Sequence, residues 1–101
     1  MPLLQHPPPK ALDTAEAAFE EALRRAPRYA DAAAELADVH ALQVHLGYGD
    51  EDPFAGYADA LRMAETAVTV DETSAQAWYA RGRIRAFAWH PIAEVLAALE
   101  R

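Results

Sequence analysis

The chain has 101 residues and a formal net charge of −7, from 9 basic and 16 acidic side chains. It contains 25 alanines, which favour helices, and no cysteine, which excludes disulfides, a thiol nucleophile and cysteine-ligated metals. The acidic balance argues against a nucleic-acid-binding or anionic-membrane surface, and no apolar run approaches the ~20 residues of a membrane span. The first ten residues lack the basic and apolar segments of a signal peptide. We therefore expect a soluble, cytoplasmic, all-α domain.

The N-terminal segment is expected to be a disordered, proline-rich leader that precedes the helical domain. Residues 1–12 form this leader, because three consecutive prolines at 7–9 favour an extended conformation and lack backbone N–H groups. The helical domain then spans residues 13–101. Its first helix is expected to begin at Asp13, a favourable N-cap residue, and to end at Pro27.

Turn residues bound the next two expected helices. The second helix is expected over residues 29–46 and ends where Gly47 interrupts it. A short acidic loop follows at residues 50–52. The third helix is expected to begin at Pro53, because an aspartate followed by proline supplies an N-cap and a first helical residue. It ends before Asp71.

The C-terminal part is expected to hold two more helices. The fourth begins near Ser74, where Thr73 and Gln76 have the spacing of a capping box. The fifth begins at Pro91, because proline is unfavourable inside a helix but suits its first turn. Five helices joined by short loops predict antiparallel helical hairpins.

Self-comparison of the chain reveals a repeat with an offset of 45 residues, from Ala15 to Ala60. The pattern Ala-x3-Phe-x2-Ala that begins at Ala15 has a counterpart that begins at Ala60, and a second pattern at Ala33 has a counterpart at Trp78. Two helix types that repeat with one offset indicate a helical-repeat architecture.

The run from Ala15 to Pro27 resembles the second helix of a tetratricopeptide repeat, and the run that begins at Ala75 resembles the start of its first helix. The resemblance covers roughly residues 13–87 and implies five helices stacked as hairpins in a short right-handed superhelix. It also implies a non-catalytic scaffold for protein–protein interaction. The family's period is about 34 residues, so the middle repeat is long. A long, loop-interrupted repeat is similar to segments of bacterial transcriptional regulators and adenylate-cyclase-type signalling proteins.

The resemblance implies that a concave face binds an extended or helical protein segment. Acidic side chains on this face would attract a basic group of the partner, and an arginine would attract an acidic one. Ordinary solvent-exposed helix faces are the alternative interpretation. The candidate partner-binding residues are Asp31, Asp38, Leu42, Gln76, Tyr79, Arg83 and Phe87.

A second group of residues is expected at an interface, because the aromatic side chains of the fourth helix cannot all face the core. Arg81 and Arg85 also stand where the resemblance implies a leucine and a tyrosine. The possible interface residues are Trp78, Arg81, Arg85 and Trp89. Because the repeats lack partners at both ends, we expect a homo-oligomer, a dimer in the simplest case. The alternatives are a place in a longer protein and a fifth helix that folds back as a cap.

The alternative function is a small all-α ribonuclease. Arg85 and His90 have the Arg-x4-His spacing of such enzymes, in which arginine holds a phosphate and histidine acts as general acid or base. The acidic balance and the lack of other enzyme motifs argue against it, so no catalytic residue is assigned. No metal is expected, because His40 and His45 lie about 140° apart around a helix, and Asp38 and His45, which share a face, are too few ligands for a closed site. No cofactor is expected. The expected partner is a protein or peptide, not a nucleic acid or a membrane.

Overall fold

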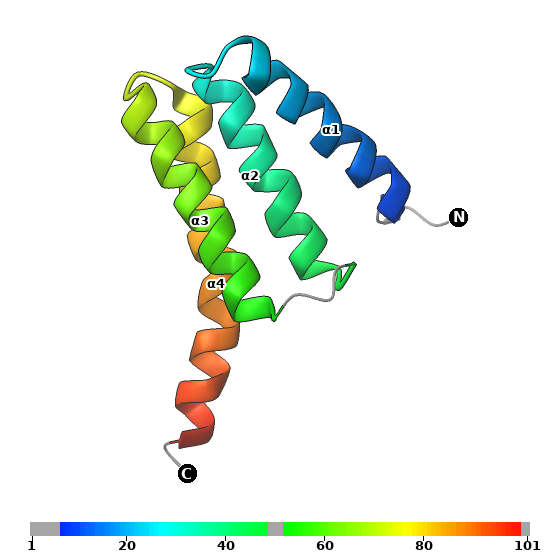
Figure 1. Ribbon diagram of the computed structural model, residues 1–101. Helices are drawn as coiled ribbons and strands as arrows, with labels where there is room; N and C mark the ends of the chain where they lie inside the picture. Colours follow the sequence, from blue (N-terminus) through cyan, green and yellow to red (C-terminus); the bar gives the residue numbers. More distant parts are fainter. Residues whose placement is uncertain (1–6, 49–51, 100–101) are drawn as a thin grey trace, which may run out of the picture.

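The computed structural model describes residues 7–48 and 52–99 (Figure 1). These residues form no strand and four α-helices: α1 (Pro9–Arg25), α2 (Ala30–His45), α3 (Pro53–Val70) and α4 (Ala75–Leu99). The expectation of an all-α fold is therefore confirmed. The expectation of five helices is wrong for the described residues, because α4 continues through the position where a fifth helix was expected to begin.

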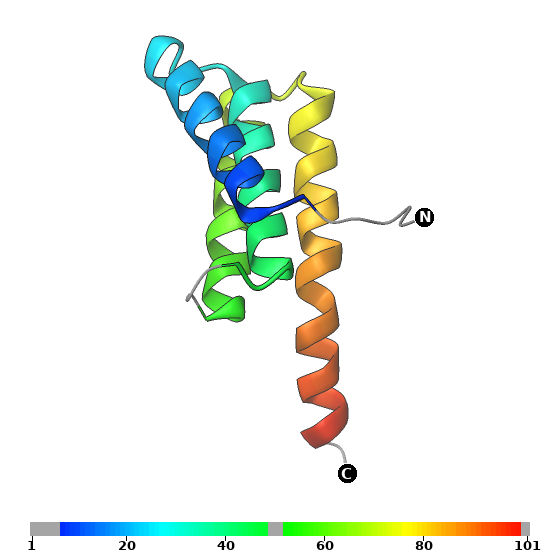
Figure 2. The ribbon, with the colours of Figure 1, turned by 90° about the vertical axis from the view of Figure 1, so that its right-hand side faces the viewer.

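Helices α2, α3 and α4 form one packed group, and α1 lies outside this group. Helices α2, α3 and α4 pack together pairwise, whereas α1 contacts α2 alone among the described helices. Successive helices run in opposite directions, so α2 and α4 run the same way with α3 beside both (Figure 1). The C-terminal part of α4 continues past the ends of α2 and α3 (Figure 2). Helix α4 is thus flanked by two helices along its first half only.

The core between α2, α3 and α4 is built almost entirely from alanine. Small side chains allow helix axes to approach closely, so the burial of backbone and methyl groups replaces the interlocking of large side chains. Ile84 is the only large side chain among the described residues that is fully buried. The alanines with no exposed surface are Ala34, Ala37, Ala41, Ala60, Ala64, Ala67, Ala77 and Ala80.

The ends of α2 and α3 lie close to where the sequence predicts them. Gly47 adopts a φ of 71°, a left-handed conformation that glycine accepts at a helix C-terminus. Helix α3 begins at Pro53, and the Asp52 side chain accepts a hydrogen bond of 3.3 Å from the backbone N–H of Phe54. The prediction of an aspartate cap followed by proline is therefore confirmed.

The start of α4 is capped by a different residue from the one expected. The backbone N–H of Ala77 donates to Oγ of Ser74 at 3.0 Å, so Ser74 is the N-cap. Thr73 does not cap the helix, because its N–H and its hydroxyl both donate to Oδ1 of Asp71, at 3.0 and 2.6 Å. The predicted capping box of Thr73 and Gln76 is wrong for this reason.

The start of α1 also differs from the expectation. The helix begins at Pro9 and not at Asp13, which lies inside it. Proline suits the first helical position, because its fixed φ is helical and its missing N–H would have no partner there. Residues 9–12 of the expected leader are therefore helical. Residues 1–6 of that leader lie outside the described residues.

Helix α4 continues through Pro91 to Leu99. A proline inside a helix removes one backbone hydrogen bond, and its ring clashes with the carbonyl four residues earlier, at a cost of about 3 kcal/mol. The helix continues despite this cost. This continuity is the reason why four helices form where five were expected. In the described part of the chain, no helix combines the length and the apolar composition needed to cross a bilayer.

Candidate functional site

Helix α4 carries most of the residues that the sequence singles out, and its two flanks meet different neighbours. On one flank, the α2–α4 seam consists of Asp31, Glu35 and Asp38 facing Ser74, Gln76 and Arg83. On the other flank, the α3–α4 cluster consists of Glu65, Trp78, Arg81 and Arg85. The buried stripe Ala77, Ala80 and Ile84 separates the two at helical spacing.

The α2–α4 seam begins with two hydrogen-bonded pairs. Oγ of Ser74 donates to Oδ1 of Asp31 at 2.6 Å, while Ser74 also caps α4. One turn further along α2, Glu35 accepts a hydrogen bond from the side-chain amide of Gln76. Two acids of α2 are thus partnered by polar groups at the start of α4, which sets the register between the two helices.

The seam ends with an ion pair that is partly withdrawn from water. Nη2 of Arg83 lies 3.5 Å from Oδ1 of Asp38, whose side chain is only 12% exposed. Burial raises the pKa of Asp38; the positive charge of Arg83 lowers it to a smaller extent, and the neighbouring Glu35 carboxylate adds to the rise. The guanidinium of Arg83 also lies 5.5 Å from the centre of the Tyr79 ring.

The structure brings five of the seven candidate partner-binding residues together along this flank of α4. Asp31 and Asp38 are engaged in contacts with Ser74 and Arg83, which the sequence did not reveal. Tyr79 is 60% exposed. Leu42 is half-buried on α2, and the side chain of Phe87 lies outside the described part. A role of these residues in binding stays a prediction.

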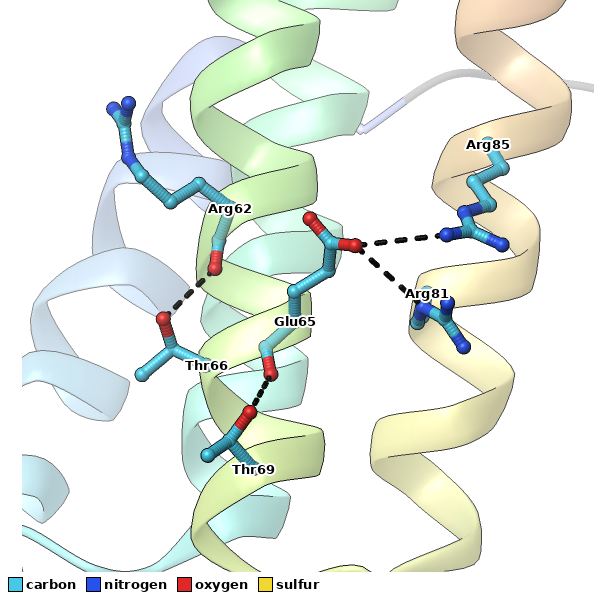
Figure 3. A network of polar contacts seen from close by, with 6 residues as sticks. All are labelled: Arg62, Glu65, Thr66, Thr69, Arg81 and Arg85. Carbon is cyan, nitrogen blue, oxygen red and sulfur yellow. Dashed lines mark hydrogen bonds and ion pairs between the residues drawn. The ribbon is translucent and has the colours of Figure 1, made fainter.

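The α3–α4 cluster joins two arginines to one acid (Figure 3). Oε2 of Glu65 on α3 lies 3.8 Å from Nε of Arg81 and 3.5 Å from Nη2 of Arg85. Arginine N–H groups form hydrogen bonds at 2.7–3.2 Å, so both contacts are longer-range ion pairs. Two positive charges therefore share one negative charge.

Trp78 belongs to the same cluster and contacts Arg81. Its Nε1–H donates to the backbone oxygen of Glu72 at 2.8 Å, which fixes the ring, and the guanidinium of Arg81 lies 5.3 Å from the ring centre. The indole is nevertheless 46% exposed. A hollow of about 190 Å³ lies here between α3 and α4 and is lined by Glu65, Val68, Thr69, Trp78 and Arg81. Trp89, the fourth predicted interface residue, is 59% exposed further along α4.

Sequence reasoning missed Glu35 and Glu65, the acids that partner Gln76 and the two arginines. Both lie on helices other than α4, and no spacing within one helix indicates which residue of another helix will face it. A pocket of about 320 Å³ between the start of α1 and the end of α2 was also missed. The hydroxyl of Tyr48 donates to the backbone oxygen of Pro7 beside it, at 2.8 Å.

The other candidate chemistry finds little support in the described residues. Arg85 pairs with Glu65, and the side chain of His90 lies outside the described part, so a catalytic pair of the two stays a prediction. Nδ1 of His45 lies 3.3 Å from the hydroxyl of Tyr57. No group of three histidine or acidic side chains suited to a metal ion occurs among the described residues.

Comparison of the chain with protein-family models, curated proteins and solved structures gives no match. The class of molecule that the fold and the site define is thus a small all-α domain with an arginine- and aromatic-rich helix exposed along one side.

Proposed function

We propose that this chain is a non-catalytic protein-interaction module of the tetratricopeptide type, in which α4 is the recognition helix. The observation that carries the proposal is the gathering of exposed aromatic side chains on this helix. Trp78, Tyr79 and Trp89 are 46%, 60% and 59% exposed. Tryptophan, tyrosine and arginine are the residue types most enriched where proteins bind one another.

The arrangement of the helices supports the same proposal. Antiparallel neighbours α2 and α3 form a hairpin, and α4 packs on both of them while running parallel to α2. Stacked helical hairpins of this kind bury each repeat against its neighbours and leave the outer helices partly uncovered. A role in bacterial signalling or regulation is part of the proposal and rests on the sequence resemblance alone.

Self-association is a second part of the proposal. Helix α1 contacts α2 alone among the described helices, and α4 continues past its neighbours, so both ends of the stack offer helix surface to a second copy. Sedimentation equilibrium at micromolar concentration is expected to give twice the chain mass of 11.1 kDa. A single species of 11.1 kDa would refute the dimer.

Affinity capture with matched variants tests the binding function. Immobilised protein is incubated with an extract of the cells that produce it, and retained proteins are quantified for the wild type, Tyr79→Ala and Tyr29→Ala. Tyr29 is 51% exposed but lies at the turn between α1 and α2, so it controls for the loss of an exposed tyrosine. We expect at least one retained protein to be lost with Tyr79→Ala and kept with Tyr29→Ala.

Two results would overturn the proposal. The first is a set of retained proteins that changes neither with Tyr79→Ala, which tests the α2 flank of α4, nor with Arg85→Ala, which tests its α3 flank, in variants whose circular dichroism shows intact helices. The second is hydrolysis of RNA by the purified protein that disappears with Arg85→Ala, since this would favour the ribonuclease alternative over a binding module.

A further inference from the structure

We propose that the α3–α4 cluster binds an acidic peptide segment, whose carboxylate pairs with Arg81 and Arg85 and whose neighbouring apolar side chain packs on Trp78. This inference rests on the proposed function and names the chemistry of its partner. The site lies on the α3 flank of α4, whereas Asp38 and Arg83, two of the concave-face residues expected from the sequence, pair on the α2 flank.

The charge of the cluster is the first argument. Two guanidinium groups share the single carboxylate of Glu65, so a surplus positive charge remains in a chain whose net charge is −7. Both contacts with Glu65, at 3.8 and 3.5 Å, are longer than the usual 2.7–3.2 Å of an N–H···O hydrogen bond. A second carboxylate would balance the charge and accept shorter hydrogen bonds from the guanidinium N–H groups than Glu65 does.

The position of the two arginines is the second argument. They are separated by one helical turn on α4, and both face Glu65 across the gap to α3 (Figure 3). The Arg81 side chain is 27% exposed and lies over the Trp78 ring, whereas the Arg85 side chain is 52% exposed. A guanidinium held over an aromatic ring loses little side-chain entropy when it binds, which favours affinity.

The hollow beside the arginines is the third argument, because it selects a peptide over a simple anion. It has a volume of about 190 Å³, and Val68 and the exposed face of Trp78 supply apolar surface in it. The indole N–H is already bonded to Glu72, so what the ring offers is contact area and not a hydrogen bond. An aliphatic side chain next to an aspartate or glutamate matches this combination.

The test uses the fluorescence of Trp78. The chain has two tryptophans, so Trp89→Phe leaves Trp78 as the only one, and its emission is followed with excitation at a wavelength that tyrosine does not absorb. The full chain with this change is titrated with a blocked peptide of leucine and glutamate, and with the same peptide carrying glutamine for glutamate. We expect the glutamate peptide to change the emission and to bind at least about tenfold more tightly than the glutamine peptide.

Three variants in this background identify the groups responsible. Arg81→Gln and Arg85→Gln are each expected to weaken binding of the glutamate peptide by about tenfold. Glu65→Gln is expected to strengthen it by about threefold, because it removes the internal competitor for both guanidiniums. A purely structural role of Glu65 would instead weaken binding. Arg62→Gln is the matched control, since Arg62 is an exposed arginine of α3 that pairs with Asp59 outside the cluster.

Several outcomes would overturn the inference. Equal affinity for the glutamine peptide would show that only apolar contact matters, and weaker binding by Glu65→Gln would exclude charge sharing. A dimer that dissociates with Arg85→Gln would identify a second copy as the occupant. Failure of peptide binding while capture still depends on Tyr79 would refute this inference alone. Peptide binding without Tyr79-dependent capture would support this inference and refute only the part of the proposed function that assigns binding to Tyr79.

Discussion

The two flanks of α4 distribute charge in opposite ways. On the α2–α4 seam, each of three acids has its own partner: Asp31 bonds to Ser74, Glu35 to Gln76 and Asp38 to Arg83. On the α3–α4 cluster, two arginines share Glu65 at ion-pair distances. We infer that the α2–α4 seam holds the two helices in register, and we propose that the two arginines of the α3–α4 cluster are available to a further acidic group.

Burial differs between the flanks in the same direction. The Asp38 side chain is 12% exposed, whereas that of Glu65 is 48% exposed. A buried charge that loses its partner pays the full cost of desolvation, while an exposed pair contributes little in either state. The comparison therefore predicts that equivalent substitutions on the two flanks will have unequal effects on stability.

The largest expected effect comes from the residue between the two flanks. Ile84→Ala removes the only fully buried large side chain among the described residues, and we expect it to lower the free energy of unfolding by about 2–5 kcal/mol. Ile84→Val should cost about 1 kcal/mol, because it removes one methylene group. Urea titration followed by circular dichroism measures both. A cost for Ile84→Ala no larger than that for Ile84→Val would show that α4 does not pack between α2 and α3 as described.

Local signals in the sequence predicted the parts of this arrangement that depend on neighbouring residues. Asp52 and Pro53 mark the start of α3, and Gly47 follows the end of α2, because caps and turns are determined within a few residues. The 25 alanines likewise predicted an all-α fold. The structure adds that the alanines of α2, α3 and α4 form most of its core.

The parts that depend on distant residues were not predictable in this way. Nothing near Arg81 and Arg85 indicates that Glu65 will lie opposite them, because this depends on how α3 and α4 align. Pro91 shows the limit even of a strong local signal. A proline costs a helix about 3 kcal/mol through a lost hydrogen bond and a clash with the carbonyl four residues earlier, yet α4 continues through it, so the local preference for a break does not decide whether a long helix ends there.

The second-largest expected effect is the difference in stability between arginine substitutions on the two flanks of α4. Arg83→Ala leaves the Asp38 carboxylate partly buried without its ion pair, and we expect a loss of about 1–3 kcal/mol in the free energy of unfolding. Arg85→Ala should change it by less than about 0.5 kcal/mol, because its pair with Glu65 is exposed and Arg81 remains. Urea titrations under identical conditions measure the difference. Equal losses of unfolding free energy for Arg83→Ala and Arg85→Ala would contradict the inference that the α2–α4 seam stabilises the fold more than the α3–α4 cluster does.

The third effect is the pH dependence of the α2–α4 seam. Burial raises the pKa of Asp38 above its ordinary value, so the folded state binds its proton more tightly than the unfolded state does. The stabilisation is therefore present at low pH and is lost as the pH rises through the raised pKa. Asp38→Asn should remove this decline, which is measured by urea unfolding at several values between about pH 3 and pH 7.

The sign of the difference in unfolding free energy between the wild type and Asp38→Asn separates the effect of burial from the attraction of Arg83. At neutral pH we expect Asp38→Asn to be at least as stable as the wild type, since the variant no longer holds a charge in a partly buried position. If the wild type instead gains stability relative to the variant as the pH rises, the attraction of Arg83 outweighs the burial of Asp38, and the seam stabilises the fold through its ion pair.

The smallest expected effect concerns Asp71, an exposed acid in the turn before α4 that contrasts with Asp38. The hydroxyl and the backbone N–H of Thr73 both donate to its carboxylate and hold the pKa of Asp71 below its ordinary value. Because the folded-state pKa is lowered, this stabilisation is present above the unfolded-state pKa and is lost as the pH falls through the folded one.

Thr73→Val removes the hydroxyl and keeps the N–H, so the pKa of Asp71 should rise towards its ordinary value. Carboxyl-carbon NMR titration measures this shift, with Ser74→Ala as the control that removes the helix cap and leaves both Thr73 contacts in place. A pKa of Asp71 that moves with Ser74→Ala but not with Thr73→Val would show that the cap, and not the Thr73 hydroxyl, controls this acid.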